Sequence, residues 1–375
     1  MARPSRIMIS AGEASGDRLG AGLARALLKR RPDLELFGMG GEKMEAAGVR
    51  LVQDSGEVAV VGILEVLSHL PAIRRAKRRL ESELQITGPD LFVPIDFPDF
   101  NLRLAAAATG NGVPVVYFVS PQVWAWRPGR VKGIRRVVRR MLVLFPFETR
   151  IYDEAGVPVT FVGHPLAEEL PPARSREELC LHAGIDPGRR TIALMPGSRR
   201  VEVERLLAVL LQAAGILSRD RPDLQFLVPV APGLSVAGME SGIAESGLDN
   251  VELHTGDFPE ILTVCHAGAV AAGTASLEAA LTGLPIVVVY RMSAVSYLLG
   301  RALVQVEHVA LPNLVAGRRV VPELIQGECN PERIAGELAA YLDRPDEARR
   351  VREALLDVRS RLGGPGIYDL SLIHI

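Results

Sequence analysis

The sequence predicts two doubly wound, Rossmann-like α/β domains that face each other across a ligand-binding cleft. Three observations lead to this fold class. Short apolar runs rich in β-branched residues alternate with helix-length segments, as in parallel sheets covered on both faces. The pattern stops at a polar, proline-bearing stretch over residues 164–180 and then restarts. With 375 residues the chain also exceeds what one hydrophobic core usually serves.

The first domain is predicted over residues 1–165. RIMISA (6–11) is its first strand and precedes a helix near 16–31. Helix-length segments separate the later strand-like runs, which are LELFGM (34–39), LFVPID (91–96), VPVVYFVS (113–120), MLVLF (141–145) and VTFVG (159–163). Because these runs are continuously apolar rather than alternating, they indicate strands buried on both faces.

The second domain is predicted over residues 166–345. It begins with a linker running into a helix, and a long helix is expected at about 201–219. The strand runs are TIALMPGS (191–198), QFLVPV (225–230), VELHTG (251–256), AGAVAAG (267–273) and PIVVVY (285–290). Residues 346–375 are predicted as a C-terminal helix and an atypical tail. The closing IYDLSLIHI is either a packed end or a sequencing or cloning artefact, and we favour the artefact.

Composition excludes several classes of protein. An apolar fraction of 48% with 23% charged residues is typical of a globular protein. The three scattered cysteines suit a reducing compartment and suggest neither a disulfide framework nor a zinc site. Since the sequence has no signal-peptide core and no apolar run of about 20 residues, we expect a cytoplasmic location.

The charge is uneven although the net value is −1. Residues 1–165 carry 23 Lys and Arg against 17 Asp and Glu, whereas residues 166–375 carry 20 against 27. This asymmetry suggests that the first half faces something anionic, with chance clustering on solvated helices as the alternative.

Two loops at predicted strand ends stand out in the first half. In ISAGEASGD (9–17), small residues open a helix whose free N–H groups suit an anion or a hydroxyl, and Glu13 and Ser15 lie in the turn. The glycine spacing is not GxGxxG, and Asp17 alone suits a helix cap. In VPIDFPDFN (93–101), Asp96 follows a buried strand, where a partly desolvated carboxylate suits a general base. Asp99 fits the first helical turn better.

The second half carries two helix starts suited to anions. LMPGSRRVEVERL (194–206) runs from strand through turn to helix, with Gly197 and Ser198 giving the backbone room and Arg199 placed to meet phosphate. GTASLEAAL (273–281) repeats the pattern, and its candidate residues are Gly273, Thr274, Ser276 and Glu278. Together they suit a diphosphate and the ribose hydroxyls, whereas either loop alone is equally an ordinary capped helix.

Further candidates are less distinctive by chemistry alone. His164 follows a strand and suits either the cleft or a structural role at the linker. Arg291 and Asn313 occupy other strand-end or loop positions. SPQVWAWRPGRVKGIRRVVRR (120–140) holds both tryptophans and seven cations without an acid, and its Gln122 and Trp124 are expected to line the cleft. The histidines form no metal-spaced cluster and there is no DxD pair, so we expect neither a metal nor a cofactor.

Taken in order, these segments closely resemble the lipid-A-disaccharide synthase family. The most specific are SPQVWAWR and LPNLVAG, and the others are SAGEASGD, GMGG, IDFPDFN, FPFE, FVGHPL, MPGSRRVEVERL, GTASLEAAL and YRM. The similarity covers about residues 6–363 and implies the two-domain GT-B fold. It also implies an inverting, metal-independent transfer of diacylglucosamine from UDP-diacylglucosamine to diacylglucosamine 1-phosphate. The implied product is the β-1′,6-linked lipid A disaccharide, made at the cytoplasmic face of the inner membrane.

The resemblance also bears on single residues. Asp96 matches a family position proposed to matter for catalysis, which supports it as the base. Arg291 and Asn313 match family residues near the donor. Members use C-terminal segments in a swapped dimer, so a homodimer is implied, but the altered tail of this chain weakens the implications of dimerisation and full activity.

Three alternatives remain open. Two lie within the fold: a UDP-N-acetylglucosamine 2-epimerase and the transferase that completes the peptidoglycan lipid precursor. The third, a nucleic-acid-binding protein, is disfavoured by a pI near 6.7 and by having only two clustered tryptophans. Separately, VVGILEVLSHLPAIRRAKRRL (60–80) suits an interfacial segment at anionic lipid, or else a buried helix followed by a solvated basic one.

Overall fold

A computed structural model describes residues 5–58, 63–125, 127–168, 174–231, 233–256, 258–293, 297, 307–364 and 366–375 of the chain. The chain forms two compact units. Unit 1 comprises Met1–His164 and Gly364–Ile375, and unit 2 comprises Pro165–Gly363. Each unit is a parallel α/β layer structure, as the sequence predicts.

The sheet of unit 1 is parallel throughout and has seven strands in the order β3-β2-β1-β4-β5-β6-β7. The strands are β1 (Arg6–Ala11), β2 (Glu35–Gly40), β3 (Arg50–Asp54), β4 (Leu91–Ile95), β5 (Val116–Phe118), β6 (Arg140–Val143) and β7 (Val159–Phe161). The order reverses direction beside β1, which is the switch point where doubly wound sheets bind ligands at their carboxyl edge.

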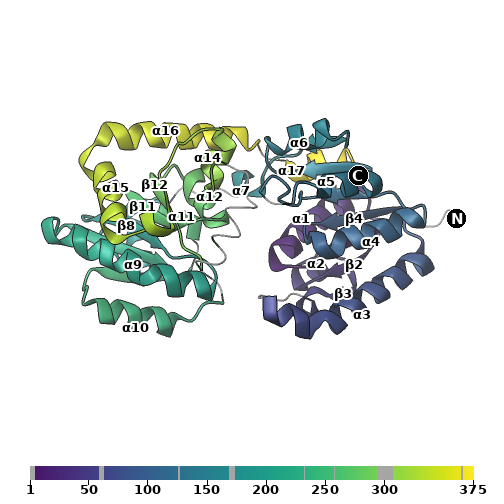
Figure 1. Cartoon of the computed structure of the whole chain (residues 1–375), viewed down its shortest axis with the longest axis horizontal. Helices are drawn as coiled ribbons and strands as arrows, with labels where there is room; N and C mark the ends of the chain where they lie inside the picture. Colours follow the sequence, from purple (N-terminus) through teal and green to yellow (C-terminus); the bar gives the residue numbers. More distant parts are fainter. Residues whose placement is uncertain are drawn as a thin grey trace. The chain divides into compact units, whose positions relative to one another are not determined.

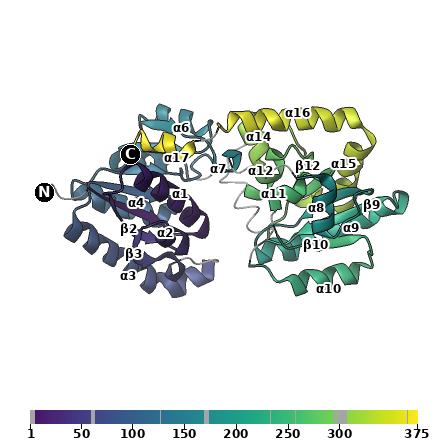
Figure 2. The same cartoon turned by 180° about the vertical axis from the view of Figure 1, so that it is seen from behind.

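Helices cover both faces of this sheet (Figures 1 and 2). One apolar layer joins β1 and β4 to α1 (Ala14–Arg30), α2 (Glu42–Ala46) and α17 (Ile367–Leu372). The opposite layer packs the sheet against α3 (Ile63–Thr87), α4 (Pro98–Gly110), α5 (Arg130–Val137) and α6 (Glu148–Glu154). A short 3-10 turn, η1 (Ser55–Glu57), follows β3.

Unit 2 has a six-stranded parallel sheet in the order β10-β9-β8-β11-β12-β13. The strands are β8 (Arg190–Met195), β9 (Leu224–Pro229), β10 (Val251–His254), β11 (Ala267–Ala271), β12 (Ile286–Tyr290) and β13 (Glu323–Ile325). Here the order reverses between β8 and β11, so the carboxyl ends of these two strands flank the second switch point.

The helices of unit 2 also form two layers. One face of its sheet packs against α9 (Arg200–Asp220), α10 (Val236–Ser246) and α15 (Pro331–Asp343). The other packs against α8 (Arg176–Ala183), α11 (Phe258–Leu262), α12 (Thr274–Leu281) and α16 (Pro345–Arg361). The remaining pieces are α7 (Pro165–Glu168), α14 (Leu311–Ala316) and η2 (Gln326–Glu328).

The predicted strand runs all contain strands, but two strands were missed. β3 and β13 are short edge strands, and neither has the continuous apolar run used to find the others. The RLVQD segment of β3 has only two apolar residues, and as an edge strand it pairs with β2 alone. Residues 346–375 divide between the units, since α16 belongs to unit 2 and α17 to unit 1.

The atypical tail packs onto unit 1. Ile367 is fully buried in the layer beneath α1, and a Cβ added at Gly22 of α1 would lie 2.2 Å from the Tyr368 ring. The Tyr368 ring therefore lies directly over Gly22, where α1 has no side chain. Packing does not reveal the origin of a segment, so the interpretation of the tail as an artefact stays a prediction.

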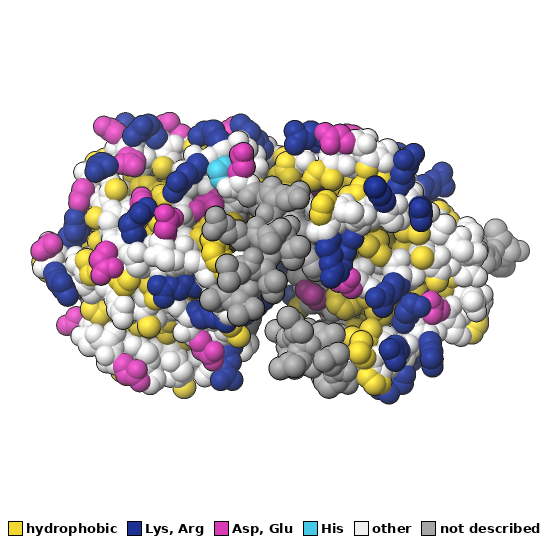
Figure 3. Space-filling model, in the orientation of Figure 1, with side chains coloured by type: hydrophobic (Ala, Val, Ile, Leu, Met, Phe, Trp, Pro, Cys, Tyr) yellow, Lys and Arg dark blue, Asp and Glu magenta, His cyan; other side chains and the backbone are white. Residues whose placement is uncertain are grey.

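Basic side chains recur over the face of unit 1 that Figure 3 shows. Along α3, Ala76, Leu80 and Leu84 are buried while Arg75 and Arg78 point outward. The side chains of residues 59–69, the apolar part of the predicted interfacial segment, lie outside the described residues. Among the helices that the structure describes, none is long and apolar enough to cross a membrane.

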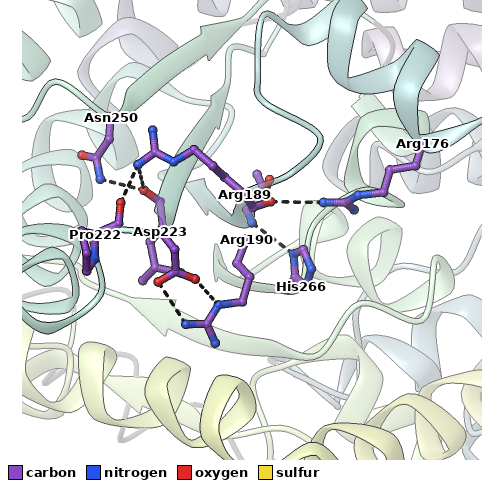
Figure 4. A network of polar contacts seen from close by, with 9 residues as sticks. Arg176, Arg189, Arg190, Pro222, Asp223, Asn250 and His266 are labelled. Atoms are coloured by element: carbon purple, nitrogen blue, oxygen red, sulfur yellow. Dashed lines mark hydrogen bonds and ion pairs between the residues drawn. The ribbon is translucent and has the colours of Figure 1, made fainter.

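The amino ends of the strands in unit 2 are fastened by a polar network (Figure 4). Arg190 forms two bonds to Asp223, of 2.6 and 3.2 Å, between the starts of β8 and β9. Arg176 donates to the Arg189 carbonyl, and His266 Nδ1 accepts from the Thr191 N–H at 3.1 Å. These groups bond strand to strand, which is the pattern of a structural edge.

Candidate functional site

The candidate residues of unit 1 follow neighbouring strands at one edge of the sheet. Glu13 and Ser15 follow β1, Asp96 follows β4, and Gln122 follows β5. These strands are neighbours in the sheet, so the sequence-predicted residues are brought to one carboxyl edge. Glu13, Ser15 and Gln122 are exposed, whereas Asp96 is half-buried.

The backbone at Asp96 is held by its own network. Asp96 and Phe97 both have left-handed backbone angles, with φ of 43° and 50°. The Asp96 carbonyl accepts from Asn101 Nδ2 at 2.9 Å and from the Tyr117 hydroxyl at 2.7 Å. Asn101 is itself fixed, since its Oδ1 accepts from the Ser10 hydroxyl at 2.7 Å. Such an uncommon conformation needs this support, and it points to a functional constraint at Asp96.

The Asp96 carboxyl has the electrostatics of a general base. Burial and, to a smaller extent, the nearby negative charge of Glu13 together raise its pKa from 3.8 to about 6. A carboxylate with such a pKa is ionised near neutral pH yet more basic than an exposed one. As predicted, Asp99 instead lies in the first turn of α4, where it is exposed and pairs with Arg130.

The β1–α1 loop closely approaches the Asp96 loop. A Cβ added at Gly12 would lie 2.2 Å from Phe97 Cδ1, so only glycine fits beneath that ring. Asp17 caps α2 rather than its own helix, because its carboxylate accepts from the N–H groups of Gly41, Lys43 and Met44 at 2.7 to 3.1 Å. The GMGG segment is thereby tied to the loop that carries Glu13 and Ser15.

Trp124 and His164 pack against aromatic rings behind this edge of the sheet and are only partly exposed on its surface. Trp124 is half-buried and meets the Phe147 ring edge-on at 5.4 Å. His164 lies against Phe145 at 5.1 Å between ring centroids. Burial lowers the pKa of His164 to about 4, so the imidazole is neutral near pH 7. Trp126, the second tryptophan of the same stretch, lies outside the described residues.

In unit 2, the loop after β8 is built to hold an anion. Gly197 has a φ of 122°, which turns the chain so that successive N–H groups point the same way. In this structure Glu202 of α9 occupies those donors: its Oε2 accepts from the Ser198 and Arg199 N–H groups at 3.0 and 3.2 Å. Its Oε1 accepts from Arg199 Nη1 at 3.0 Å. The three donors predicted to bind phosphate therefore already hold a carboxylate.

The loop after β11 gives a mixed result. Gly273 and Thr274 are exposed at the start of α12, and Gly273 has a φ of 132° that favours glycine. Ser276, by contrast, is fully buried and donates to the Gly273 carbonyl at 2.7 Å. Its predicted contact with the diphosphate is corrected to a role in shaping the helix start. Glu278 is half-buried one turn further along α12.

Asn313 is likewise a structural residue in this unit. Its side chain is fully buried, its Nδ2 donates to Val321 O and Glu323 Oε1, and its Oδ1 accepts from the Val320 and Val321 N–H groups. With these bonds the amide has no capacity left for the donor, so its predicted direct contact is corrected. Glu323 in turn accepts from the Ala310 N–H and so orders the chain entering α14.

Arg291 follows β12 and is half-buried beside Cys329: burial raises the pKa of that thiol, and the positive charge of Arg291 opposes the rise. The next residue, Met292, is fixed at both backbone groups by Gln326, with bonds of 2.8 and 3.2 Å. Tyr290, at the end of β12, lies within electrostatic reach of Arg199 and Glu202. The loops after β8 and β12 therefore follow strands of the same parallel sheet, with β11 between those strands.

Sequence reasoning assigned no role to Asn101, Tyr117, Glu148, Glu202 or Gln326. Of these only Glu202 left a local signal, as an acidic residue at the predicted helix start, and in the structure it lies three residues after the N-cap Arg199. The others act through contacts between distant segments. Within the described residues, no group of three or more His, Cys, Asp or Glu is placed to hold a metal ion.

Comparison with known proteins bears on the whole chain. The family model described as lipid-A-disaccharide synthetase matches residues 7–363. The lipid-A-disaccharide synthase of Geobacter sulfurreducens is 48% identical over 364 residues, covering 97% of this chain and 94% of that protein. Those of Syntrophus aciditrophicus and Myxococcus xanthus are 47% and 45% identical, each covering 98% of this chain and 96% and 95% of theirs.

Solved structures share the fold at low identity. UDP-N-acetylglucosamine 2-epimerase from Neisseria meningitidis, bound to UDP-GlcNAc, matches with a TM-score of 0.65 at 12% identity, over 98% of this chain and 99% of that one. MurG of Acinetobacter baumannii matches with a TM-score of 0.59 at 14% identity, over 99% of both chains. These neighbours support the prediction of two Rossmann-like domains of the GT-B type.

Proposed function

The chain belongs to the lipid-A-disaccharide synthetase family, and from this premise we propose how its residues carry out the transfer. As a member it is a glycosyltransferase that forms the lipid A disaccharide. The donor is UDP-2,3-diacylglucosamine and the acceptor is 2,3-diacylglucosamine 1-phosphate. The observation that carries the proposal is the half-buried Asp96 carboxyl, with its pKa raised to about 6 on a fixed backbone.

Asp96 is the general base of an inverting displacement. The acceptor hydroxyl loses its proton to this carboxylate as its oxygen bonds to the anomeric carbon of the donor, while the bond from that carbon to the UDP oxygen breaks. A single displacement inverts the configuration and yields the β-1′,6 linkage. Glu13 supports the base by raising its pKa. Ser15 and Gln122, exposed on the same edge, are available for the acceptor sugar.

Unit 2 holds the UDP group. Negative charge gathers on the diphosphate as it leaves, and preorganised donors stabilise it. The Ser198 and Arg199 N–H groups and the Arg199 guanidinium already bind a carboxylate, which supports their affinity for a phosphate. Thr274 at the start of α12 adds a hydroxyl, and Glu278 suits the ribose hydroxyls. Phosphate binding exchanges with Glu202, which releases the donors.

These donors do the electrostatic work that a divalent ion does in other nucleotide-sugar enzymes, so we propose a metal-independent transfer without a cofactor. Purified protein incubated with both substrates and a chelator is expected to release UDP and form the disaccharide 1-phosphate. A folded sample that releases no UDP, with or without magnesium, would refute the transferase function. Activity only with magnesium would refute metal independence alone.

We also propose that unit 1 contacts the cytoplasmic face of the inner membrane, where both acylated substrates reside. The exposed arginines of α3 support this, since each basic residue near an anionic surface contributes about 1 kcal/mol. Sedimentation with anionic vesicles should weaken with salt and in the variant Arg75→Glu/Arg78→Glu/Arg79→Glu. The same charge change at Arg318, Arg319 and Arg350 of unit 2 is the control. Equal binding by both variants would reject the contact.

A further inference from the structure

The FPFE segment (145–148), which precedes α6, has no part in the chemistry above. Glu148 is the first residue of α6 and is only 3% exposed. Its Oε2 accepts from the Phe145 N–H at 3.1 Å, which closes the turn after β6. Burial raises the pKa of this carboxyl to about 8. A helix start on the surface does not require a buried carboxyl, so other contacts must account for it.

Those contacts come from the loop after β5. Burial dominates the raised pKa of Glu148, and the Ser120 and Trp124 side chains oppose that rise. Ser120 Oγ is also 2.8 Å from the hydroxyl of Tyr152, one turn further along α6. The Trp124 Nε1 atom is buried without a bond of normal geometry to any described residue.

Aromatic contacts extend the cluster to β7. Trp124 meets Phe147 edge-on, and Phe147 stacks on Phe145 at 5.4 Å with an angle of 17° between the rings. Phe145 in turn touches His164. Glu148 thus lies where the ends of β5, β6 and β7 meet, directly behind the loop that presents Gln122 to the acceptor.

We infer that Glu148 is a positioning residue for the acceptor: by accepting from the Phe145 N–H it holds the Phe145 and Phe147 rings, and Trp124, in the loop over residues 120–124 that bears Gln122, packs against Phe147. Glu148 itself does not touch the substrate. This inference rests on the proposed function, because it takes that loop to contact the acceptor sugar. It accounts for the buried carboxyl, since its bond to the Phe145 N–H holds the turn whose rings pack toward Trp124.

The test uses Glu148→Gln in the full chain. The variant is compared with the wild type above pH 8, where the Glu148 carboxyl is ionised. There the amide keeps the shape but can present an N–H group where the Phe145 N–H already points, so the loop should shift. The expected result is a KM for diacylglucosamine 1-phosphate raised about tenfold, with UDP affinity within about twofold of the wild type. Both tryptophans of the chain, Trp124 and Trp126, lie in or beside the loop, so the emission maximum should also move. Tyr152→Phe removes a single neutral bond and should raise the same KM about threefold.

The matched control is Glu260→Gln, a buried carboxyl of unit 2 that pairs with Arg174 at 3.3 Å. It should leave the acceptor KM and the tryptophan emission unchanged. Equal loss of UDP affinity and acceptor affinity in Glu148→Gln, or no change in KM and emission, would overturn the inference. If Glu148→Gln does not fold, Tyr152→Phe decides by the same two readouts. If wild-type protein releases no UDP, the proposed function fails, while the emission shift still tests the fixing of the loop.

Discussion

The carboxyl edges of the two sheets carry different chemistry on the same fold. The edge of unit 1 presents a half-buried carboxyl with a raised pKa, and hydrogen bonds hold its backbone in a left-handed conformation. The edge of unit 2 presents backbone N–H groups, a guanidinium and a glycine with positive φ, all around an anion already in place. The first arrangement suits proton transfer and the second suits binding of phosphate.

The difference shows that the doubly wound fold determines where a site forms but not which chemistry it performs. In both units the strands deliver loops to a switch point, and the side chains after the strands decide the chemistry. The amino edge of unit 2, fastened by pairs such as Arg190–Asp223, serves stability only. If the edge of unit 1 transfers the proton and the edge of unit 2 binds the diphosphate, substitutions in unit 1 should change kcat and substitutions in unit 2 should change UDP affinity.

The largest expected effect is on turnover at the edge of unit 1. Asp96→Asn keeps the shape but removes the base, so kcat should fall by about 10²–10⁴-fold. Asp99→Asn, three residues away on an exposed helical turn, is the matched control and should keep kcat within about twofold. Steady-state UDP release measures both. Similar losses of kcat in both variants would contradict the role of Asp96 as the general base.

The next effect is on binding at the edge of unit 2. Arg199→Ala removes a charge-assisted bond to phosphate and should weaken UDP binding about 10- to 100-fold. Arg200→Ala, whose partner is Glu204, should have little effect because that pair is exposed. Isothermal titration calorimetry with UDP decides. Comparable losses from both substitutions would mean that general positive charge, rather than the loop after β8, binds the diphosphate.

A smaller effect of opposite sign is expected at Glu202. Because its carboxylate occupies the donors that phosphate needs, Glu202→Gln should strengthen UDP binding about two- to fivefold, as expected for one charge at a helix N-terminus. Glu204→Gln, two residues on and exposed, should leave the affinity unchanged. Weaker binding in Glu202→Gln would show that the carboxylate organises the site instead of competing for it.

The smallest effect concerns pH. The base must be ionised, so kcat/KM should fall as pH drops through about 6, the pKa of Asp96. The charge of Glu13 raises that pKa, so Glu13→Gln should move this acidic limb to lower pH. The same raised pKa means that ionising Asp96 destabilises the folded state. The free energy of unfolding should therefore decrease as the pH rises from 3.8 to about 6. If the acidic limb of the pH profile did not move in Glu13→Gln, Glu13 would have no electrostatic effect on Asp96.

The fold and the strand-end loops could be predicted because their signals are local. A continuous apolar run followed by small residues and a helix start marks a parallel strand and its loop, as in residues 6–17 and 191–206. Roles that depend on burial could not be predicted. Ser276 and Asn313 look like ligand-binding residues in sequence, but their polar atoms are used inside unit 2. The role of Glu148 could not be predicted because it depends on contacts among loops that follow three different strands.

The most direct test of the division between the two units is UDP binding to Asp96→Asn, measured by calorimetry on the same preparation whose turnover is lost. The account predicts a Kd within about twofold of the wild type, because the base makes no contact with the diphosphate. A Kd weakened in proportion to the loss of turnover would contradict it, and would make Asp96 part of the binding site or of the fold.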